Sequence, residues 1–183
     1  MIPTHIKTLT ASGDSSLAFV DGTASVVFDS TYGEYMFVFN NMNVADSSVE
    51  FGFQVNKVDD SGFDKATTSC KFFVEHLESG GLNDGFSYDS ANDQNQGISY
   101  QTIVRECGNS ANENFNGVLH IFSPSNTTYV THFYSRIASS VVHDGSAAHF
   151  CAGYFNITEA IDEISFAPSG GNFDGVIQMY GIA

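Results

Sequence analysis

The sequence predicts an all-β protein, specifically a two-sheet antiparallel β-sandwich of jelly-roll type. The composition is the first reason: 17 Phe and 8 Tyr stand among 183 residues, with no Trp and only 15% charged residues. Disordered chains, coiled coils and helical bundles are rich in charge or in strong helix formers, so this composition excludes them. The second reason is a recurring pattern of short apolar-alternating segments separated by turn residues. A closed β-barrel would bury the same residues and is the alternative.

Strand-like segments follow one another along the whole chain. Val49–Val55 alternates large apolar residues with polar or small ones, which indicates a strand with one buried face. Tyr35–Phe39 is apolar at every position, which predicts a central strand covered on both sides. Further strands are expected at Ile6–Ala11, Leu17–Val20, Ser25–Phe28, Cys70–Leu77, Phe86–Tyr88, Thr102–Cys107, Val118–Phe122, Tyr129–Arg136, Phe150–Phe155, Glu163–Ala167 and Val176–Tyr180.

Turn-forming residues separate these segments. Asp21-Gly22 and Asn83-Asp84-Gly85 are examples, because Asp-Gly pairs supply the positive φ that tight turns require. The polar stretch Ser79–Gln101 is expected to be the largest loop. The helical candidate is a single turn at Thr158–Asp162, which Thr158 could cap.

Size and charge limit the function classes. The length fits one domain, residues 1–183. The net charge is −15, with 21 acidic and 6 scattered basic residues, so nucleic acid and anionic membrane surfaces are not expected partners. No apolar segment approaches the roughly 20 residues that span a bilayer. The first residues lack a basic stretch followed by an apolar run, so we expect no signal peptide and synthesis in the cytoplasm.

Catalytic and thiol chemistry have little support in the sequence. The chain contains no nucleophile elbow, phosphate loop, dinucleotide fingerprint or zincin motif. Glu50, Glu75 and Glu106 could share a face as glycosidase carboxylates do, but no spacing places two of them side by side on one strand. We therefore expect no enzyme. The three cysteines are widely spaced and are expected to be free and buried.

Histidines on predicted strands are possible ligands for a metal. His149 and Cys151 fall on one face of a strand, but they lack a second pair to complete a zinc shell, so ordinary packing is expected. His120 and His132 could meet across neighbouring strands, as polar residues often do on a sheet face.

Calcium is the ligand that the sequence favours over zinc. The segment 89–95 is dense in oxygen donors, and Asp89, Asp93 and Asn95 are the candidate ligands. Ala91 stands where a calcium loop has its second ligand, so the usual order of donors is broken. No catalytic or cofactor-binding residue is assigned, and calcium is the possible cofactor.

Three parts of the chain resemble small structural proteins of tailed bacteriophages, of the type found in marine and cyanobacterial phages. The matching segments are Ile6–Gly13 with Leu17–Gly22, then Tyr32–Asn41, and finally Ala152–Asn156, Ile161–Phe166 and Gly175–Gly181. These relatives are β-sandwich virion components without known catalytic residues, so the resemblance implies a fold and a location but no site.

The resemblance implies a non-catalytic virion component, made in the host cytoplasm. A head decoration or cement subunit, or another multi-copy accessory protein, is the first expectation. A tail-tip or fibre-head module that binds host-surface glycan is the alternative, and a glycan-cleaving enzyme comes third. Expected partners are capsid or tail proteins and further copies of the chain, in a trimer. Aromatic residues in loops would serve either binding role: Phe63, Phe86, Tyr88, Tyr100 and Phe173.

Overall fold

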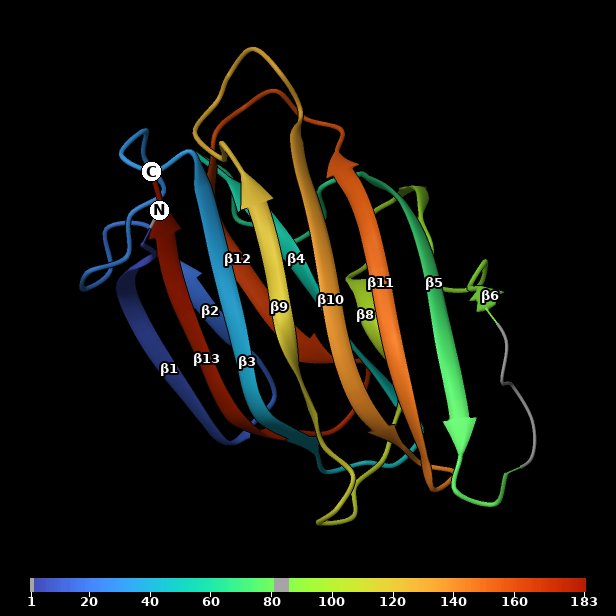
Figure 1. The fold of residues 1–183 in the computed structure, drawn as a ribbon. Helices are drawn as coiled ribbons and strands as arrows, with labels where there is room; N and C mark the ends of the chain where they lie inside the picture. Colours follow the sequence, from blue (N-terminus) through green and yellow to red (C-terminus); the bar gives the residue numbers. More distant parts are fainter. Residues whose placement is uncertain (1, 81–85) are drawn as a thin grey trace.

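The computed structural model describes residues 2–80 and 86–183 as two facing layers of β-strands (Figure 1). None of these residues forms a helix, and so none forms a helix that could cross a membrane. Every strand pairing among them is antiparallel. The strands are β1 (Thr4–Asp14), β2 (Leu17–Val20), β3 (Glu34–Val44), β4 (Val49–Lys57), β5 (Thr67–Leu77), β6 (Phe86–Tyr88), β7 (Asn95–Gly97), β8 (Gln101–Cys107), β9 (Phe115–Phe122), β10 (Thr131–Val141), β11 (Gly145–Phe155), β12 (Ile161–Pro168) and β13 (Phe173–Ile182).

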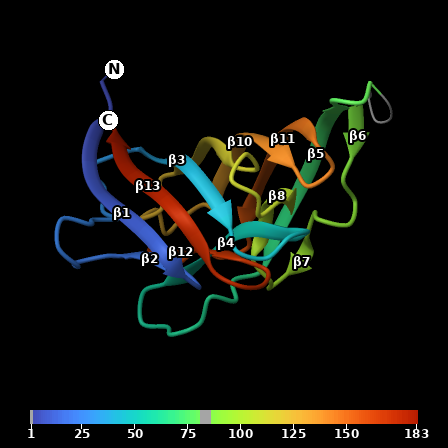
Figure 2. The ribbon, with the colours of Figure 1, turned by 90° about the horizontal axis from the view of Figure 1, so that it is seen from below.

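The predicted antiparallel sandwich is confirmed. The large sheet has the order β1-β13-β3-β9-β10-β11-β5, with β6 and β7 pairing to the outer edge of β5, and the small sheet has the order β2-β12-β4-β8 (Figures 1 and 2). Consecutive strands from β1 to β5 alternate between the sheets, which is the winding of a jelly roll. The pair Val141–Cys107 joins β10 to β8 and gives one edge a barrel-like continuity.

The first and last strands pair along most of their lengths at the edge of the large sheet. Thr4 lies opposite Gly181, and Asp14 lies opposite Phe173. The two ends of the chain therefore lie together at one corner of the molecule (Figure 1).

Phenylalanine rings fill much of the space between the sheets. Phe166, on β12, is fully buried. Its ring centroid lies between 5.3 and 6.4 Å from those of Phe19, Phe37, Phe39 and Phe53. These distances fall in the range of favourable edge-to-face and tilted ring contacts, so the rings from both sheets interlock around Phe166.

Two strands differ from their predicted coverage. Val49–Val55 was expected to have one buried face, but β4 is buried on both, because the segments before β5 and before β8 cover its outer side. The Gln54 side chain fixes both segments, since its Nε2 donates to the carbonyls of Lys65 (3.1 Å) and Ser99 (3.0 Å). Tyr35–Phe39 is predicted to be covered on both sides, but only one face of β3 is fully buried there. The residues on its outer face are half-buried.

For the segment after β2, one prediction is confirmed and one is wrong. The turn at Asp21-Gly22 is confirmed, and Gly22 has a φ of 75°. The strand expected at Ser25–Phe28 does not form. Instead, the Phe28 amide donates to the Asp21 carboxylate (2.7 Å), so a local side-chain bond replaces strand pairing.

The helical turn expected at Thr158–Asp162 is also absent, because Ile161 already begins β12. The Ile161 amide donates to the carbonyl of Pro124 (2.9 Å) and joins this end of the strand to another loop. The turn expected at 83–85 lies outside the described residues.

Candidate functional site

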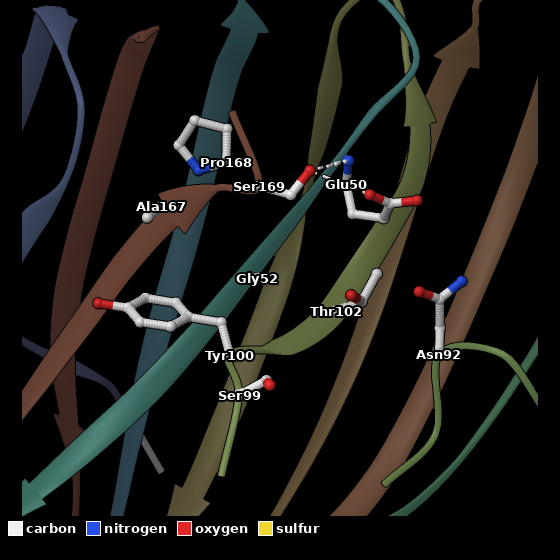
Figure 3. Close-up of a pocket in the computed structure, with 9 residues that line it drawn as sticks. All are labelled: Glu50, Gly52, Asn92, Ser99, Tyr100, Thr102, Ala167, Pro168 and Ser169. Carbon is white, nitrogen blue, oxygen red and sulfur yellow. Dashed lines mark hydrogen bonds between the residues drawn. The ribbon is translucent and has the colours of Figure 1, made fainter. Parts of the chain in front are cut away.

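A groove of about 500 Å³ lies on the outer face of the small sheet (Figure 3). Its floor is the cross-strand pair Gly52 of β4 and Thr102 of β8. A Cβ at position 52 would lie 2.6 Å from the Gln101 carbonyl oxygen, so only glycine lets the two strands approach this closely. The floor of the groove is therefore a close contact between two strands.

The groove has one aromatic wall and one proline wall. The Tyr100 ring extends over β4 toward β12, where its hydroxyl bonds to the Ser165 hydroxyl (2.9 Å). Pro168, at the end of β12, lies on the other side of the groove (Figure 3). Tyr100 is one of the loop aromatics singled out from the sequence, and the hydrogen bond holds its ring in place.

Oxygen atoms supply the polar lining of the groove. One oxygen of the Glu50 carboxylate accepts a hydrogen bond from the Ser169 hydroxyl (3.0 Å), which fixes the carboxylate at the rim. The side chains of Asn92, Ser99 and Thr102 line the remaining surface. A second hollow of about 320 Å³, lined mainly by residues 91–97, shares these three residues and Tyr100 and continues the groove. An uncharged ligand with many hydroxyl groups suits this combination of apolar walls and oxygen atoms.

The structure assigns other contacts to the candidate calcium ligands. Asp89 is buried and its Oδ2 lies 2.5 Å from Nζ of Lys71, while the Asn92 amide donates to both of its carboxylate oxygens (3.1 Å each). Asp93 accepts a hydrogen bond from the Tyr88 hydroxyl. Asn95 is exposed on β7. Across residues 2–80 and 86–183, no three His, Cys, Asp or Glu side chains are grouped to hold a metal ion.

A buried polar cluster lies at the β5 side of the sandwich, where the guanidinium carbon of Arg105, from β8, lies 4.6 Å from the ring centroid of Phe73. Lys71 and His149 are both fully buried there, on β5 and β11. Nε2 of His149 is paired with the Ser139 hydroxyl (2.9 Å), while its Nδ1 has no partner. Burial, together with the positive charges of Lys71 and Arg105, lowers the pKa of His149 to about 3, so this ring is neutral near neutral pH. Burial also lowers the pKa of Lys71.

The thiols are in two kinds of environment. Cys107 and Cys151 are free and buried, as expected, and burial raises the pKa of each to about 12. Cys70 is free but exposed, which corrects the expectation for that residue, because it points to the outer face of β5. His149 and Cys151 do share the inner face of β11, where both are packed.

The three glutamates considered as glycosidase carboxylates lie in different surroundings. Glu50 is at the groove, whereas Glu75 is buried on the inner side of β5. Glu106 forms an ion pair with Arg105 on β8. The structure therefore gives Glu50 and Glu75 no common face.

Aromatic side chains cover much of the outer face of the large sheet. Two groups of stacked or tilted rings cross neighbouring strands, with ring centroids 4.5 to 5.8 Å apart. The guanidinium carbon of Arg136 lies 5.6 Å from the ring centroid of Phe150. We call this surface the outer aromatic face, and define it by Phe72, Phe86, His120, Phe122, Tyr134, Arg136 and Phe150.

The predicted strand histidines and loop aromatics lie in several different places. His120 stacks on Tyr134 and pairs with Glu34, whereas His132 lies near Tyr154. Phe86 and Tyr88 are exposed, but Phe173 is buried against Phe51, and Phe63 is half-buried. Sequence patterns identified the individual strands; the stacking across strands depends on their order in the sheet, which no local pattern reveals.

No protein-family model matches the chain, and no curated protein matches it significantly. The groove, the buried polar cluster and the outer aromatic face are therefore the features from which function is argued.

Proposed function

We propose that this protein is a non-catalytic structural component of a tailed-phage virion, either a head decoration subunit or another multi-copy accessory protein. The outer aromatic face carries the proposal. Phe86 is 68% exposed and Tyr134 41% exposed, although both stack with neighbouring rings. Contiguous exposed apolar patches mark interaction surfaces, and aromatic residues and arginine are enriched at the centres of protein interfaces.

The charge distribution supports a protein partner at this face. The chain has a net charge of −15, so copies repel one another over much of their surface. The outer aromatic face adds the guanidinium of Arg136 and the ring of His120 to its apolar area. Capsid or tail subunits, and further copies of this chain in a trimer, are the partners that we propose. The resemblance to virion proteins agrees with this assignment.

Imaging of intact virions with a labelled antibody against the chain tests the location. Labels distributed over the head are expected for a decoration subunit, and labels confined to the tail tip favour the glycan-binding alternative. Particles without any label would contradict the virion assignment.

Incorporation of variants tests the face itself. Tyr134→Asp, supplied during infection by a phage that lacks the gene, is expected to fold but to be missing from purified particles. Ile98→Asp is the matched control, because Ile98 is also exposed, at 60%, but precedes β8 near the groove. Equal incorporation of both variants would exclude the outer aromatic face as the attachment surface.

The groove favours a second candidate function, recognition of host-surface glycan. Sugars present C–H faces that pack on aromatic rings and hydroxyl groups that bond to carboxylate, amide and hydroxyl oxygens. Tyr100 and Glu50 supply these two kinds of contact across the groove. The Glu50 carboxylate repels anionic sugars, so the expected ligand is an uncharged glycan.

A glycan array followed by calorimetry tests this candidate. Tyr100→Ala is expected to abolish binding, whereas Tyr129→Ala leaves it unchanged, because Tyr129 is exposed and lies outside the groove. Retained binding in Tyr100→Ala would show that the groove is not the glycan site.

A further inference from the structure

Lys71 and Asp89 form a buried amine–carboxyl pair between neighbouring strands. β6 runs antiparallel to β5 with Phe72 opposite Tyr88, so Lys71 and Asp89 are the next facing pair. The Asp89 amide donates to the Lys71 carbonyl (2.9 Å), which aligns the two backbones. The side chains meet with Nζ 2.5 Å from Oδ2. The backbone thus holds the amine of Lys71 against the carboxyl group of Asp89.

Both side chains of this pair are removed from water. The Lys71 side chain has no exposed area and that of Asp89 is 3% exposed. Nζ of Lys71 lies 5.9 Å from the centroid of the Phe73 ring, and Cys151 faces Lys71 from β11. Removing the ammonium charge from water is costly, so burial favours the neutral amine of Lys71, and a proton that leaves Nζ has the adjacent Oδ2 of Asp89 as its acceptor. The lowered pKa of Lys71 agrees with this tendency.

We propose that Lys71 and Asp89 condense to an intramolecular isopeptide bond. The lone pair on the neutral Nζ of Lys71 attacks Cγ of Asp89, and the Nζ–Cγ bond forms. The Cγ–O bond to the hydroxyl oxygen then breaks. That oxygen leaves as water, with the proton of the acid and one proton from Nζ. No oxidant, reductant or other reactant is needed, and the chain loses one water molecule.

One neighbouring side chain and the geometry of the pair itself assist this step. The Asn92 amide donates to both carboxyl oxygens of Asp89, so it can stabilise negative charge on oxygen in the tetrahedral adduct. The proton that Nζ gives up has Oδ2 of Asp89 as its acceptor at 2.5 Å, so the step needs no further base. The fixed strand register supplies the proximity that such condensation requires.

The bond would restrict the movement of the loop before β8. The chain from residue 71 to residue 89 would be closed into a covalent ring. The segment that carries Asn92 would thereby be fixed to β5. Such a cross-link restricts the unfolded chain as a disulfide does, but it resists reduction. A virion part exposed outside the cell would gain durability from it.

The mass of the intact wild-type chain tests the proposal directly. After folding and a long incubation at neutral pH, the denatured protein is expected to weigh one water molecule less than its sequence. Trypsin is expected not to cut after Lys71, because an acylated lysine is not a substrate. The digest would then contain one peptide covering residues 66–105, lighter by one water, in place of the separate peptides 66–71 and 72–105. Full mass together with cleavage after Lys71 would overturn the proposal.

Three variants locate the bond. Lys71→Arg preserves a positive charge but cannot condense, so its full sequence mass is expected. Lys65→Arg is the matched control, because Lys65 is also buried and paired with Asp60 and Asp64, and it is expected to keep the loss of water. Asp89→Asn is expected to release ammonia in place of water. Loss of water that persists in Lys71→Arg would assign the bond to other residues and refute this pair.

Discussion

The buried His149 makes the fold sensitive to acid, and the size of the effect follows from its environment. The pKa of His149 is about 3 in the folded protein against an ordinary value of 6.5, chiefly because burial disfavours the charged ring. The unfolded chain therefore binds a proton at a higher pH than the folded chain does. Stability is fully present above about pH 6.5 and falls as the pH drops from there toward 3. Between about pH 8 and about pH 5, the protonation of this residue in the unfolded chain should lower the free energy of unfolding by about 2 kcal/mol.

Urea denaturation of wild type and His149→Gln at the two pH values measures this contribution. Glutamine can still bond to the Ser139 hydroxyl, which lies 2.9 Å from Nε2, but it does not titrate. The wild type is expected to lose about 2 kcal/mol more than the variant, because acidic groups elsewhere affect both proteins equally. His143→Gln is the control for the loss of a histidine that is not buried, since the His143 side chain is 57% exposed. Equal acid sensitivity of wild type and His149→Gln would refute the argument from burial.

Three further substitutions or reactions test the packing. Phe166→Ala removes the ring around which four others pack and should lower the free energy of unfolding by about 3–5 kcal/mol in urea titrations; a loss below about 1 kcal/mol would show that the core closes around the gap. Gly52→Ala should lower the free energy of unfolding by about 1–3 kcal/mol, because the added Cβ meets the neighbouring strand. Gly33→Ala should lower it far less, because a Cβ at position 33 meets nothing within 4 Å. Equal changes in Tm for the two variants would exclude the close strand contact. A thiol reagent at mildly alkaline pH should modify only Cys70 in the native protein, because burial raises the pKa of the other two thiols to about 12, and mass spectrometry would expose any rapid second addition.

Local sequence patterns found most of the strands because the two-residue period of a sheet is visible in any one segment. The same patterns did not predict which strand faces are buried, because the segments that cover those faces are distant in the sequence. The pattern of Val49–Val55 is that of a strand with one solvent-exposed face, but residues before β5 and β8 cover that face and accept hydrogen bonds from Gln54. Asn95–Gly97 forms β7 despite a wholly polar sequence, because it pairs with the start of β5. Such a strand has no apolar period to detect.

The candidate sites could be predicted only in part. Tyr100 was identified as a loop aromatic, but the groove also needs Glu50 and Pro168, which lie about fifty positions or more away in the sequence. Lys71 belongs to no motif and Asp89 was considered only as a calcium ligand, and only the β5–β6 register places the two together inside the protein. Residue type alone predicts exposure for both, so the buried pair could not be inferred before the strand order was known.

The corner where the chain begins and ends determines how the molecule responds to tension. Because Thr4 faces Gly181, pulling the two ends apart loads the first hydrogen bonds between β1 and β13 before the rest. The strands would peel apart one pair at a time at low force, whereas a pull across the sheet would load many pairs together. A tether attached at either end leaves from the same corner, so it holds the sandwich without stretching it. The fold therefore tolerates strain on a single attachment better than strain between its two ends.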